Sequence, residues 1–246
     1  LRTLLKKTED LNIPIHDTQY VTELLIRNDI CFGAMSFNIS TAERTIHLAD
    51  AVILCTGGHT RIWKRSSSRD KENTGDGYYL GLKAGCELTD MEMVQFHPTG
   101  MISSDEFSGA LVTEAVRGEG GKLLNCKRER FMIHYDKERM ELSTRDRVAI
   151  ANYTEITEGR ATPNGGIYLD ISHMDKEFIL KKLPNIYRQF LDTQMIDITK
   201  EPMEVAPTAH YSMGGLVVDP KEHATSIQGL YAAGEVTGGL HGANRL

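Results

Sequence analysis

The sequence predicts an α/β fold in which a sheet domain is interrupted by an inserted, mainly helical domain. Three observations support this expectation. Residues 51–55 form a continuous apolar run, which is typical of a strand buried on both faces of a parallel sheet. The stretch from about 92 to 209 has a different texture and contains long helical stripes. Residues 216–218 and 230–233 then return to short apolar runs, as expected if the chain comes back to the first sheet.

In the amino-terminal part, the patterns predict a helix, several strands and a second helix. The first helix is expected at residues 4–10. The strands expected here, besides residues 51–55, are residues 13–16, 20–26, 31–37 and 45–49. A loop of hairpin length separates the second and third of these strands. Residues 77–84 predict a short helix that ends at Gly85 as a C-cap.

The middle of the chain predicts helices around one strand. A helix is expected from Arg145 to Glu158, capped by Ser143 or Thr144 and stopped by Gly159. Its apolar face is expected to include Ala149, Tyr153 and Ile156, which follow helical spacing. Residues 167–171 predict a strand. The following helical stripe contains Pro184, which we interpret as the start of a second helix.

The bulk composition excludes several classes of partner. The chain has 246 residues, and 28 basic against 34 acidic side chains give a formal net charge of −6 without a basic block. This balance argues against nucleic acid and against a polybasic membrane contact. No run of about 18 apolar residues codes for a transmembrane helix, and the charged first residues do not resemble a secretory signal. We therefore expect a cytoplasmic location, either free or at the cytoplasmic face of a membrane through partner subunits.

The cysteines are interpreted as structural thiols. Cys31, Cys55, Cys86 and Cys126 lie far apart and form no Cys-x-x-Cys pair. Such isolated thiols are typical of a reducing compartment. Iron–sulfur and zinc sites within this chain find no support, and no histidine pair has metal-ligand spacing. The sequence therefore predicts no metal site.

Glycine loops punctuate the predicted sheet domain. The loops are Gly57-Gly58, Gly75-Asp76-Gly77, Gly234 and Gly238-Gly239. Turn formation explains any single loop adequately. Together they predict a cofactor site, because glycine lets a backbone approach a ligand closely at the carboxyl ends of parallel strands. Thr56, Gly57 and Gly58 end the predicted strand at residues 51–55.

Two acidic residues stand beside these loops. Asp76 lies just before a predicted helix, where a carboxylate is well placed as a cap. Glu235 follows a predicted strand, where a carboxylate can accept hydrogen bonds from ribose hydroxyls. The complete Gly-x-Gly-x-x-Gly fingerprint is absent. If the fold binds a dinucleotide, its first βα unit is therefore expected before residue 1.

Several segments carry more polar chemistry than a protein core needs. They are residues 95–100, 113–121, 143–146, 209–215 and 241–246. Glu114 and Arg117 share a face of a helical turn, for which a surface ion pair worth at most about 1 kcal/mol is the plainer explanation. Histidines beside glycines, with three arginines, instead predict a pocket for a small dianion, because arginine forks bind carboxylates bidentately. Arg145 is expected in the first turn of its helix, where the helix macrodipole disfavours a cation. Because a cation at this position does not help to stabilise the helix, we interpret Arg145 as a functional residue.

These segments, in this order, resemble the flavoprotein subunit family of succinate dehydrogenase and fumarate reductase. Each segment is weak evidence alone, whereas the ordered set across residues 51–246 is specific. L-aspartate oxidase is a close relative of this family. The matching segments are Thr74-Gly75-Asp76-Gly77, residues 95–100, residues 113–121, Arg145-Asp146, residues 169–171, residues 207–215 and residues 241–246.

The resemblance implies a fold and a set of roles. The fold is a Rossmann-type FAD-binding domain interrupted by an inserted α+β capping domain. Residues 1–91 would be the partial FAD-binding domain, residues 92–209 the capping and substrate domain, and residues 210–246 the return to the FAD-binding domain. The implied reaction is hydride transfer between flavin N5 and a carbon of succinate or fumarate. The implied partners are a C4 dicarboxylate and an iron–sulfur electron-transfer subunit.

The resemblance also implies which residues act. Arg145 matches the general acid or base, and Glu114 and Arg117 match the relay that resets its proton. The groups that would hold the two carboxylates are His97, Thr113, His210 and Arg245. The residues that would contact FAD are Asp76 and Glu235, with Thr56, Gly57 and Gly58 as the strand-end candidates.

Two departures from the family pattern concern the ends of the chain. The amino-terminal glycine fingerprint, and the histidine that can bond covalently to flavin in this family, would precede residue 1. The loop expected after Leu246 is also missing. We therefore expect this chain on its own to bind flavin weakly or not at all.

Three alternatives remain open. L-aspartate oxidase is the first, although Gly100 and Met213 look more like the succinate and fumarate branch. A non-catalytic capping or assembly fragment is the second, and the intact Arg145, Glu114 and Arg117 argue against decay of the parent site. A nicotinamide-dependent disulfide reductase is the third, and it lacks any paired redox cysteines.

Overall fold

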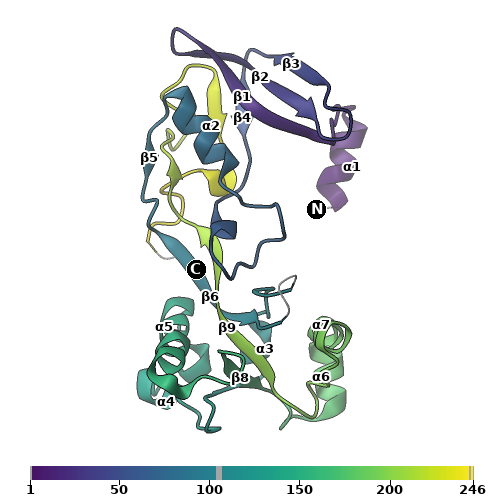
Figure 1. Ribbon diagram of the computed structural model, residues 1–246, viewed down its shortest axis with the longest axis vertical. Helices are drawn as coiled ribbons and strands as arrows, with labels where there is room; N and C mark the ends of the chain where they lie inside the picture. The colour runs from purple at the N-terminus through teal and green to yellow at the C-terminus, as the bar shows by residue number, and fades with distance from the viewer. Residues whose placement is uncertain (1, 104–106, 244, 246) are drawn as a thin grey trace.

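The computed structural model describes residues 2–103, 107–243 and 245. Figure 1 shows an elongated molecule with two parts that are connected along β6 (Val94–Met101) and β9 (Met203–Ser212). Each part has its own cluster of buried apolar side chains. The sequence-based boundaries at 91/92 and 209/210 stay predictions, and β9 carries the second part on to Ser212.

The first part begins with a helix and an antiparallel sheet. Helix α1 (Arg2–Asp10) precedes strands β1 (Gln19–Arg27), β2 (Ile30–Asn38) and β3 (Arg44–Leu48), which lie in the order β1-β2-β3. These elements agree with the sequence-based expectation, including the hairpin between β1 and β2. The strand predicted at residues 13–16 is wrong, because this exposed segment has no ladder partner and Pro14 has no N–H to donate.

A short parallel pair brings the end of the chain back to the first part of the molecule. Strand β4 (Val52–Leu54) pairs in parallel with β11 (Leu230–Ala232), so segments about 180 residues apart in sequence lie side by side. The prediction that β4 is buried on both faces is wrong, because Ile53 is 62% exposed. The apolar run reflects one buried face, at Leu54, and one open face.

Helix α2 (Asp76–Ala84) packs on this region and ends at Gly85, as predicted. Gly85 adopts φ +97°, the left-handed conformation that favours glycine at a helix end. A short antiparallel pair, β5 (Leu88–Thr89) with β10 (Gly215–Leu216), completes the first part. The apolar run predicted at residues 216–218 therefore forms a strand only at its first residue.

The second part is built on a four-stranded antiparallel sheet, with the order β6-β9-β8-β7. Strand β7 spans Lys122–Leu124 and β8 spans Ile167–Asp170. The segment expected to be mainly helical therefore also contains a sheet, of which only the strand at residues 167–171 was predicted. The strand signal was masked because β6 contains Pro98 and Gly100, which sequence patterns assign to turns. The pairing of β6 with β9 shifts register between His97 and Gly100, and this irregularity accommodates the proline.

Helices cover this sheet. They are α3 (Ala115–Gly118), α4 (Met132–Tyr135), α5 (Arg145–Glu155), α6 (Lys176–Lys182) and α7 (Pro184–Gln194). Pro184 occupies the first turn of α7, which confirms that it starts a second helix. Helix α5 begins after Thr144 and passes into a π-helical turn, Ile156–Arg160. The predicted apolar face of α5 is partly wrong, because Tyr153 is 62% exposed and Val148 lies in the core instead.

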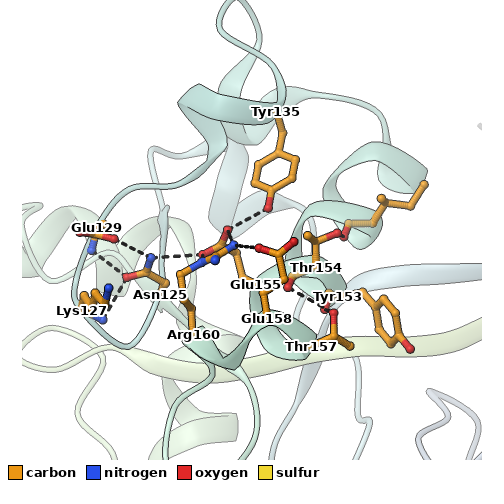
Figure 2. A network of polar contacts seen from close by, with 11 residues as sticks. Asn125, Lys127, Glu129, Tyr135, Tyr153, Thr154, Glu155, Thr157, Glu158 and Arg160 are labelled. Carbon is orange, nitrogen blue, oxygen red and sulfur yellow. Dashed lines mark hydrogen bonds and ion pairs between the residues drawn. The ribbon is translucent and has the colours of Figure 1, made fainter.

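A polar network fixes the carboxyl-terminal end of α5 (Figure 2). The buried Glu155 carboxylate accepts hydrogen bonds from Arg160 Nε (2.6 Å) and Nη2 (2.7 Å) and from Tyr135 Oη (2.8 Å). Asn125 Nδ2 donates a further bond at 3.2 Å. One turn earlier, Asn152 Nδ2 donates to the carbonyl of Pro98 in β6 (2.9 Å). Helix α5 is therefore held at its far end and against the strand that carries His97.

Candidate active site

Two histidines from neighbouring strands face each other at the junction of the two parts. His97 lies on β6, opposite Thr208 of β9, and His210 lies two residues further along β9. Their ring centroids are 5.5 Å apart in an edge-to-face arrangement. His97 is only 2% exposed, whereas His210 is partly exposed. Antiparallel pairing thus brings together two predicted carboxylate-binding residues that lie far apart in sequence.

Both imidazoles are held neutral near pH 7. The pKa of His97 is lowered to about 3, mainly by burial and also by the adjacent His210, Arg117 and Arg145. Burial also lowers the pKa of His210 to about 4, with Arg245 and Arg145 adding to the effect. A neutral imidazole has one N–H donor and one acceptor nitrogen. Each ring can therefore donate one hydrogen bond to an anion while its other nitrogen accepts a bond from the protein.

The backbone fixes the tautomer of His97. Its Nδ1 lies 3.3 Å from the backbone N–H of Thr99, which can only donate. Thr99 Oγ1 donates its own proton to the carbonyl of Val112 (2.8 Å) and has none left for the ring. Nδ1 of His97 is therefore the acceptor, and Nε2 carries the hydrogen.

An ion-pair chain lies beside the histidines. Arg145 Nε donates to Glu114 Oε2 (3.0 Å), and Glu114 Oε1 lies 3.4 Å from Arg117 Nη2. Arg117 is 2% exposed, and its Nη1 donates to the carbonyl of Glu141. Burial lowers the pKa of Arg117, Arg145 lowers it further, and Glu114 and Glu141 oppose this shift. The predicted pairing of Glu114 with Arg117 is confirmed, and it is extended to Arg145.

Gln95 connects this chain of charges to Arg245, and the sequence-based prediction of site residues omitted it. Its Oε1 accepts from Arg145 Nη1 (3.4 Å), and its Nε2 donates to the backbone carbonyl of Arg245 (2.5 Å). The available signal was its position in the same segment as His97. The Arg245 guanidinium stacks 4.1 Å from the Tyr211 ring centroid. The neighbouring predicted motif residues Asn244 and Leu246 lie outside the described residues.

Thr113 lies two residues before α3 and directly precedes Glu114. Its Oγ1 accepts a hydrogen bond from the backbone N–H of Ala115 (3.4 Å), a local turn bond two residues along the chain. Its hydroxyl proton is not used in that bond. Thr113 therefore keeps a donor that can be offered to an anion beside the ion-pair chain.

The predicted cofactor residues meet at one sheet edge. Thr56, Gly57 and Gly58 follow β4 and Glu235 follows β11, and the carboxyl ends of parallel strands lie at the same edge. Glu235 Oε1 accepts from the backbone N–H of Ser212 (2.9 Å). Burial raises the pKa of this carboxyl group. The loop after β4 and the acidic residue after β11 therefore lie next to each other, so close that a Cβ placed on Gly58 would collide with Glu235 Oε1.

Asn73 closes this edge and was missed by sequence reasoning. Its Oδ1 accepts from the backbone N–H of Gly58 (3.1 Å), and its Nδ2 donates to Glu235 Oε2 (3.4 Å). No periodicity or spacing in the sequence points to this asparagine. Asn73 can bond to both Gly58 and Glu235 only because the carboxyl ends of β4 and β11 lie close together.

Asp76 is placed differently from its predicted capping role. It is the first residue of α2, and the cap position belongs to Gly75. Its carboxylate accepts from Thr74 Oγ1 (2.9 Å) and from Tyr20 Oη (3.3 Å) instead. An acidic residue in the first helical turn still favours the helix through the macrodipole.

The backbone at this edge is open beside Glu235. Gly234 adopts φ +81°, and a Cβ placed there would meet no atom within 4 Å, so the backbone beside Glu235 faces open space. Gly57 also has a positive φ, +74°, which orients the loop after β4. Exposed Thr56 and the amino-terminal end of α2 lie in the same region. These residues fit a cofactor that carries ribose hydroxyls and phosphates.

Two of the hollows in the described structure can be compared with the predicted site. One of about 280 Å³ is lined by Gln95, Asp146 and Met213 and adjoins the histidine and arginine site. Another of about 770 Å³ is lined by Arg128 and Tyr168, among others, and contains none of the predicted site residues. Gln95, which bonds to Arg145 and to the carbonyl of Arg245, is the residue that relates the smaller hollow to the predicted site.

The fold and the site together define a flavin-binding α/β protein. The FAD binding domain family matches residues 1–246, and the chain belongs to this family. FAD is the cofactor that this membership assigns to the chain. The resemblance to succinate dehydrogenase and fumarate reductase flavoprotein subunits is likewise confirmed by the relatives.

Several relatives are named as flavoprotein subunits of fumarate reductase or succinate dehydrogenase. The chain is 52% identical over 230 residues to one component of the CoM/CoB fumarate reductase of Methanothermobacter marburgensis, covering 94% of this chain and 41% of that protein. It is 40% identical to the L-aspartate oxidase of Clostridium perfringens, covering 96% of this chain and 51% of that protein. The chain thus spans about half the length, or less, of these curated relatives.

Solved structures give the same result. A mutant FrdA of the E. coli quinol fumarate reductase superposes on the chain with a TM-score of 0.90 at 36% identity. That match covers 100% of this chain and 44% of FrdA.

No helix in the described part of the chain has both the length and the apolar composition needed to cross a bilayer.

Proposed function

We propose that the protein interconverts succinate and fumarate, with FAD as its redox group. One observation carries this proposal: two neutral histidines and Arg245 lie beside a chain of alternating charges, Arg145–Glu114–Arg117. The cluster offers hydrogen-bond donors and net positive charge in one partly buried place. A small dianion is the ligand that this combination recognises best.

The donors can hold a dicarboxylate at both ends. His97 presents Nε2–H because its Nδ1 accepts the Thr99 N–H. Arg245 provides a planar fork whose orientation is set by stacking on Tyr211. Thr113 adds a hydroxyl donor next to Glu114. Binding both carboxylates orients the carbon–carbon bond between them and restricts its rotation, which lowers the entropic part of the barrier.

Arg145 is proposed as the proton donor. An arginine is a weak acid, with a pKa above about 12 in water, so it gives up a proton only to a stronger base such as a carbanion-like carbon. FAD, when bound, supplies or accepts the hydride at N5. The proton that Arg145 releases can be replaced through Glu114, whose carboxylate lies 3.0 Å from Arg145 Nε and 3.4 Å from Arg117.

We also propose the organisation that the resemblance implies. Residues 92–209 would cap the FAD-binding part, and the site lies where the two parts meet, a usual location for ligands. An iron–sulfur electron-transfer subunit is the proposed protein partner. It would place the protein in the cytoplasm or at the cytoplasmic face of a membrane. Two relatives are named as subunits of fumarate reductases, which supports the proposal of a partner subunit.

Steady-state turnover of the whole flavin-loaded protein tests the proposal. We expect reduction of fumarate and oxidation of succinate, with no more than trace oxidation of L-aspartate. L-aspartate oxidation at a rate similar to that of succinate would favour the alternative, which the 40% identity to an L-aspartate oxidase motivates. Absence of turnover with all three compounds would overturn the proposed activity.

A further inference from the structure

The loop before α2 runs directly alongside the strand that carries His210. Ala209 N donates to the carbonyl of Arg65 (3.0 Å), and Ser67 N donates to the carbonyl of Ala209 (2.9 Å). Ser66 forms an isolated parallel bridge with the same alanine. These backbone bonds place Ser67 beside His210 independently of any side-chain contact. The loop therefore holds Ser67 in a defined position at the site.

Ser67 contacts the ring of His210. Its Oγ lies 2.8 Å from His210 Nδ1, a normal hydrogen-bond distance. A serine hydroxyl can donate or accept, so this bond allows either tautomer when it is considered alone. The ring itself is neutral, because it is largely buried beside the guanidinium groups of Arg145 and Arg245. One ring nitrogen must therefore carry the hydrogen and the other must accept.

We propose that Ser67 is a positioning residue that donates its hydroxyl proton to Nδ1 of His210 and thereby places the ring hydrogen on Nε2. The inference rests on the proposed function and deepens it. With Ser67 as donor, His210 presents Nε2–H to a bound carboxylate. With Ser67 as acceptor, the ring would present a lone pair, which repels an anion.

The neighbouring histidine supports this direction. His97 has the same arrangement, with Nδ1 accepting from the protein and Nε2–H left for a ligand. The two rings lie 5.5 Å apart, so a single dianion can reach both. Thr99 fixes the first ring through the backbone, and Ser67 fixes the second through a hydroxyl. Fixing the donor in advance avoids an ordering cost when the anion binds.

Nitrogen NMR of the whole flavin-loaded protein, labelled with ¹⁵N-histidine, tests the tautomer directly. We expect His210 to show an unprotonated Nδ1 and a protonated Nε2, assigned by the loss of its signals in His210→Gln. Ser67→Ala is expected to give a mixture of tautomers. Ser67→Thr keeps the hydroxyl and is expected to restore the original pattern. A protonated Nδ1 in the unaltered protein would overturn the proposal.

Calorimetric titration with malonate, an unreactive dicarboxylate, tests the consequence. We expect Ser67→Ala to weaken binding by about five- to tenfold, the effect of one hydrogen bond, and Ser67→Thr to restore it to within about twofold. Ser66→Ala is the matched control, because Ser66 lies in the same loop but bonds to Thr60. An equal loss in Ser66→Ala, or no loss in Ser67→Ala, would overturn the proposal.

The two hypotheses fail in different ways. If the unaltered protein does not bind malonate, the dicarboxylate function is overturned, and with it the purpose assigned to Ser67. If malonate binds and the tautomer of His210 does not depend on Ser67, only the positioning role is overturned.

Discussion

Glu114 and Arg145 form an ion pair with Oε2 of the glutamate 3.0 Å from Nε of the arginine, although they are 31 positions apart in sequence. The pair joins the residue before α3 to the first residue of α5. The other carboxylate oxygen lies 3.4 Å from Arg117 Nη2. One carboxylate thus connects a partly exposed arginine to a buried one. The first two predictions below follow from this connection.

Replacing Arg145 should remove the chemical step without removing substrate binding. In the whole enzyme, we expect Arg145→Gln to lower kcat and kcat/KM for fumarate together by about a thousandfold, because proton delivery acts only in the transition state. Arg145→Lys should be similarly impaired, since a lysine cannot reproduce the planar fork. Malonate affinity, measured by calorimetry, should change by less than about tenfold.

The control for this experiment is Arg147→Gln on the same helix. Arg147 is 66% exposed and pairs with Asp136 at 3.7 Å, so its loss should leave kcat within about twofold. If Arg145→Gln kept its kcat and mainly raised KM, Arg145 would be a carboxylate ligand. His210 would then be the first candidate for the acid.

Replacing Glu114 should interrupt the proposed proton relay. We expect Glu114→Gln to lower kcat by about tenfold to a hundredfold, because an amide cannot pass a proton between the two arginines as a carboxylate does. The matched control is Glu119→Gln at the other end of α3, where Glu119 pairs with Lys182 at 3.4 Å. Stopped-flow measurement of flavin reoxidation by fumarate reports the step directly. Equal rates in both variants would contradict the relay.

The buried histidines should make the protein lose stability in mild acid. The pKa of His97 is lowered from 6.5 to about 3, so between these values the unfolded chain binds a proton that the folded chain does not. The free energy of unfolding should therefore fall as pH drops from about 6.5 towards 3, by up to about 1.4 kcal/mol per pH unit from this residue.

Urea unfolding between pH 7 and pH 4 measures this effect. His97→Gln should reduce the slope of the free energy of unfolding against pH by the amount that corresponds to the uptake of one proton on unfolding. This change in slope is expected whether or not the substitution alters the free energy of unfolding at pH 7. Replacement of the exposed His173 by Gln serves as the control, because it removes a histidine without removing a buried one. An unchanged slope in His97→Gln would show that the imidazole is already protonated in the folded protein.

The network at the end of α5 should matter for stability. Glu155 is 3% exposed and accepts two hydrogen bonds from Arg160, so we expect Glu155→Gln to lower the free energy of unfolding by about 3 kcal/mol. Glu158 also pairs with Arg160 but is exposed, and Glu158→Gln should cost less than about 1 kcal/mol. Urea denaturation at neutral pH compares the two, and equal losses would contradict this ranking.

Much of the fold was predictable because the local signals agree with the tertiary structure. The hairpin of β1 and β2, the end of α2 at Gly85 and the helix start at Pro184 all follow from short-range patterns. Strands β6 and β9 were not predicted. Pro98 and Gly100 normally mark turns, and only pairing with a strand more than 100 residues away holds them in a sheet.

The sequence by itself determined the family, the cofactor class and the ordered set of charged and histidine residues, because residue types at fixed spacing are local information. The tertiary structure alone decided which of them meet. Antiparallel pairing sets His97 near His210, and the packing of α5 on β6 brings Arg145 to Glu114 and Gln95. The parallel pair of β4 with β11 gives Asn73 its place between Gly58 and Glu235. These contacts depend on long-range burial and register, and no local pattern encodes either of them.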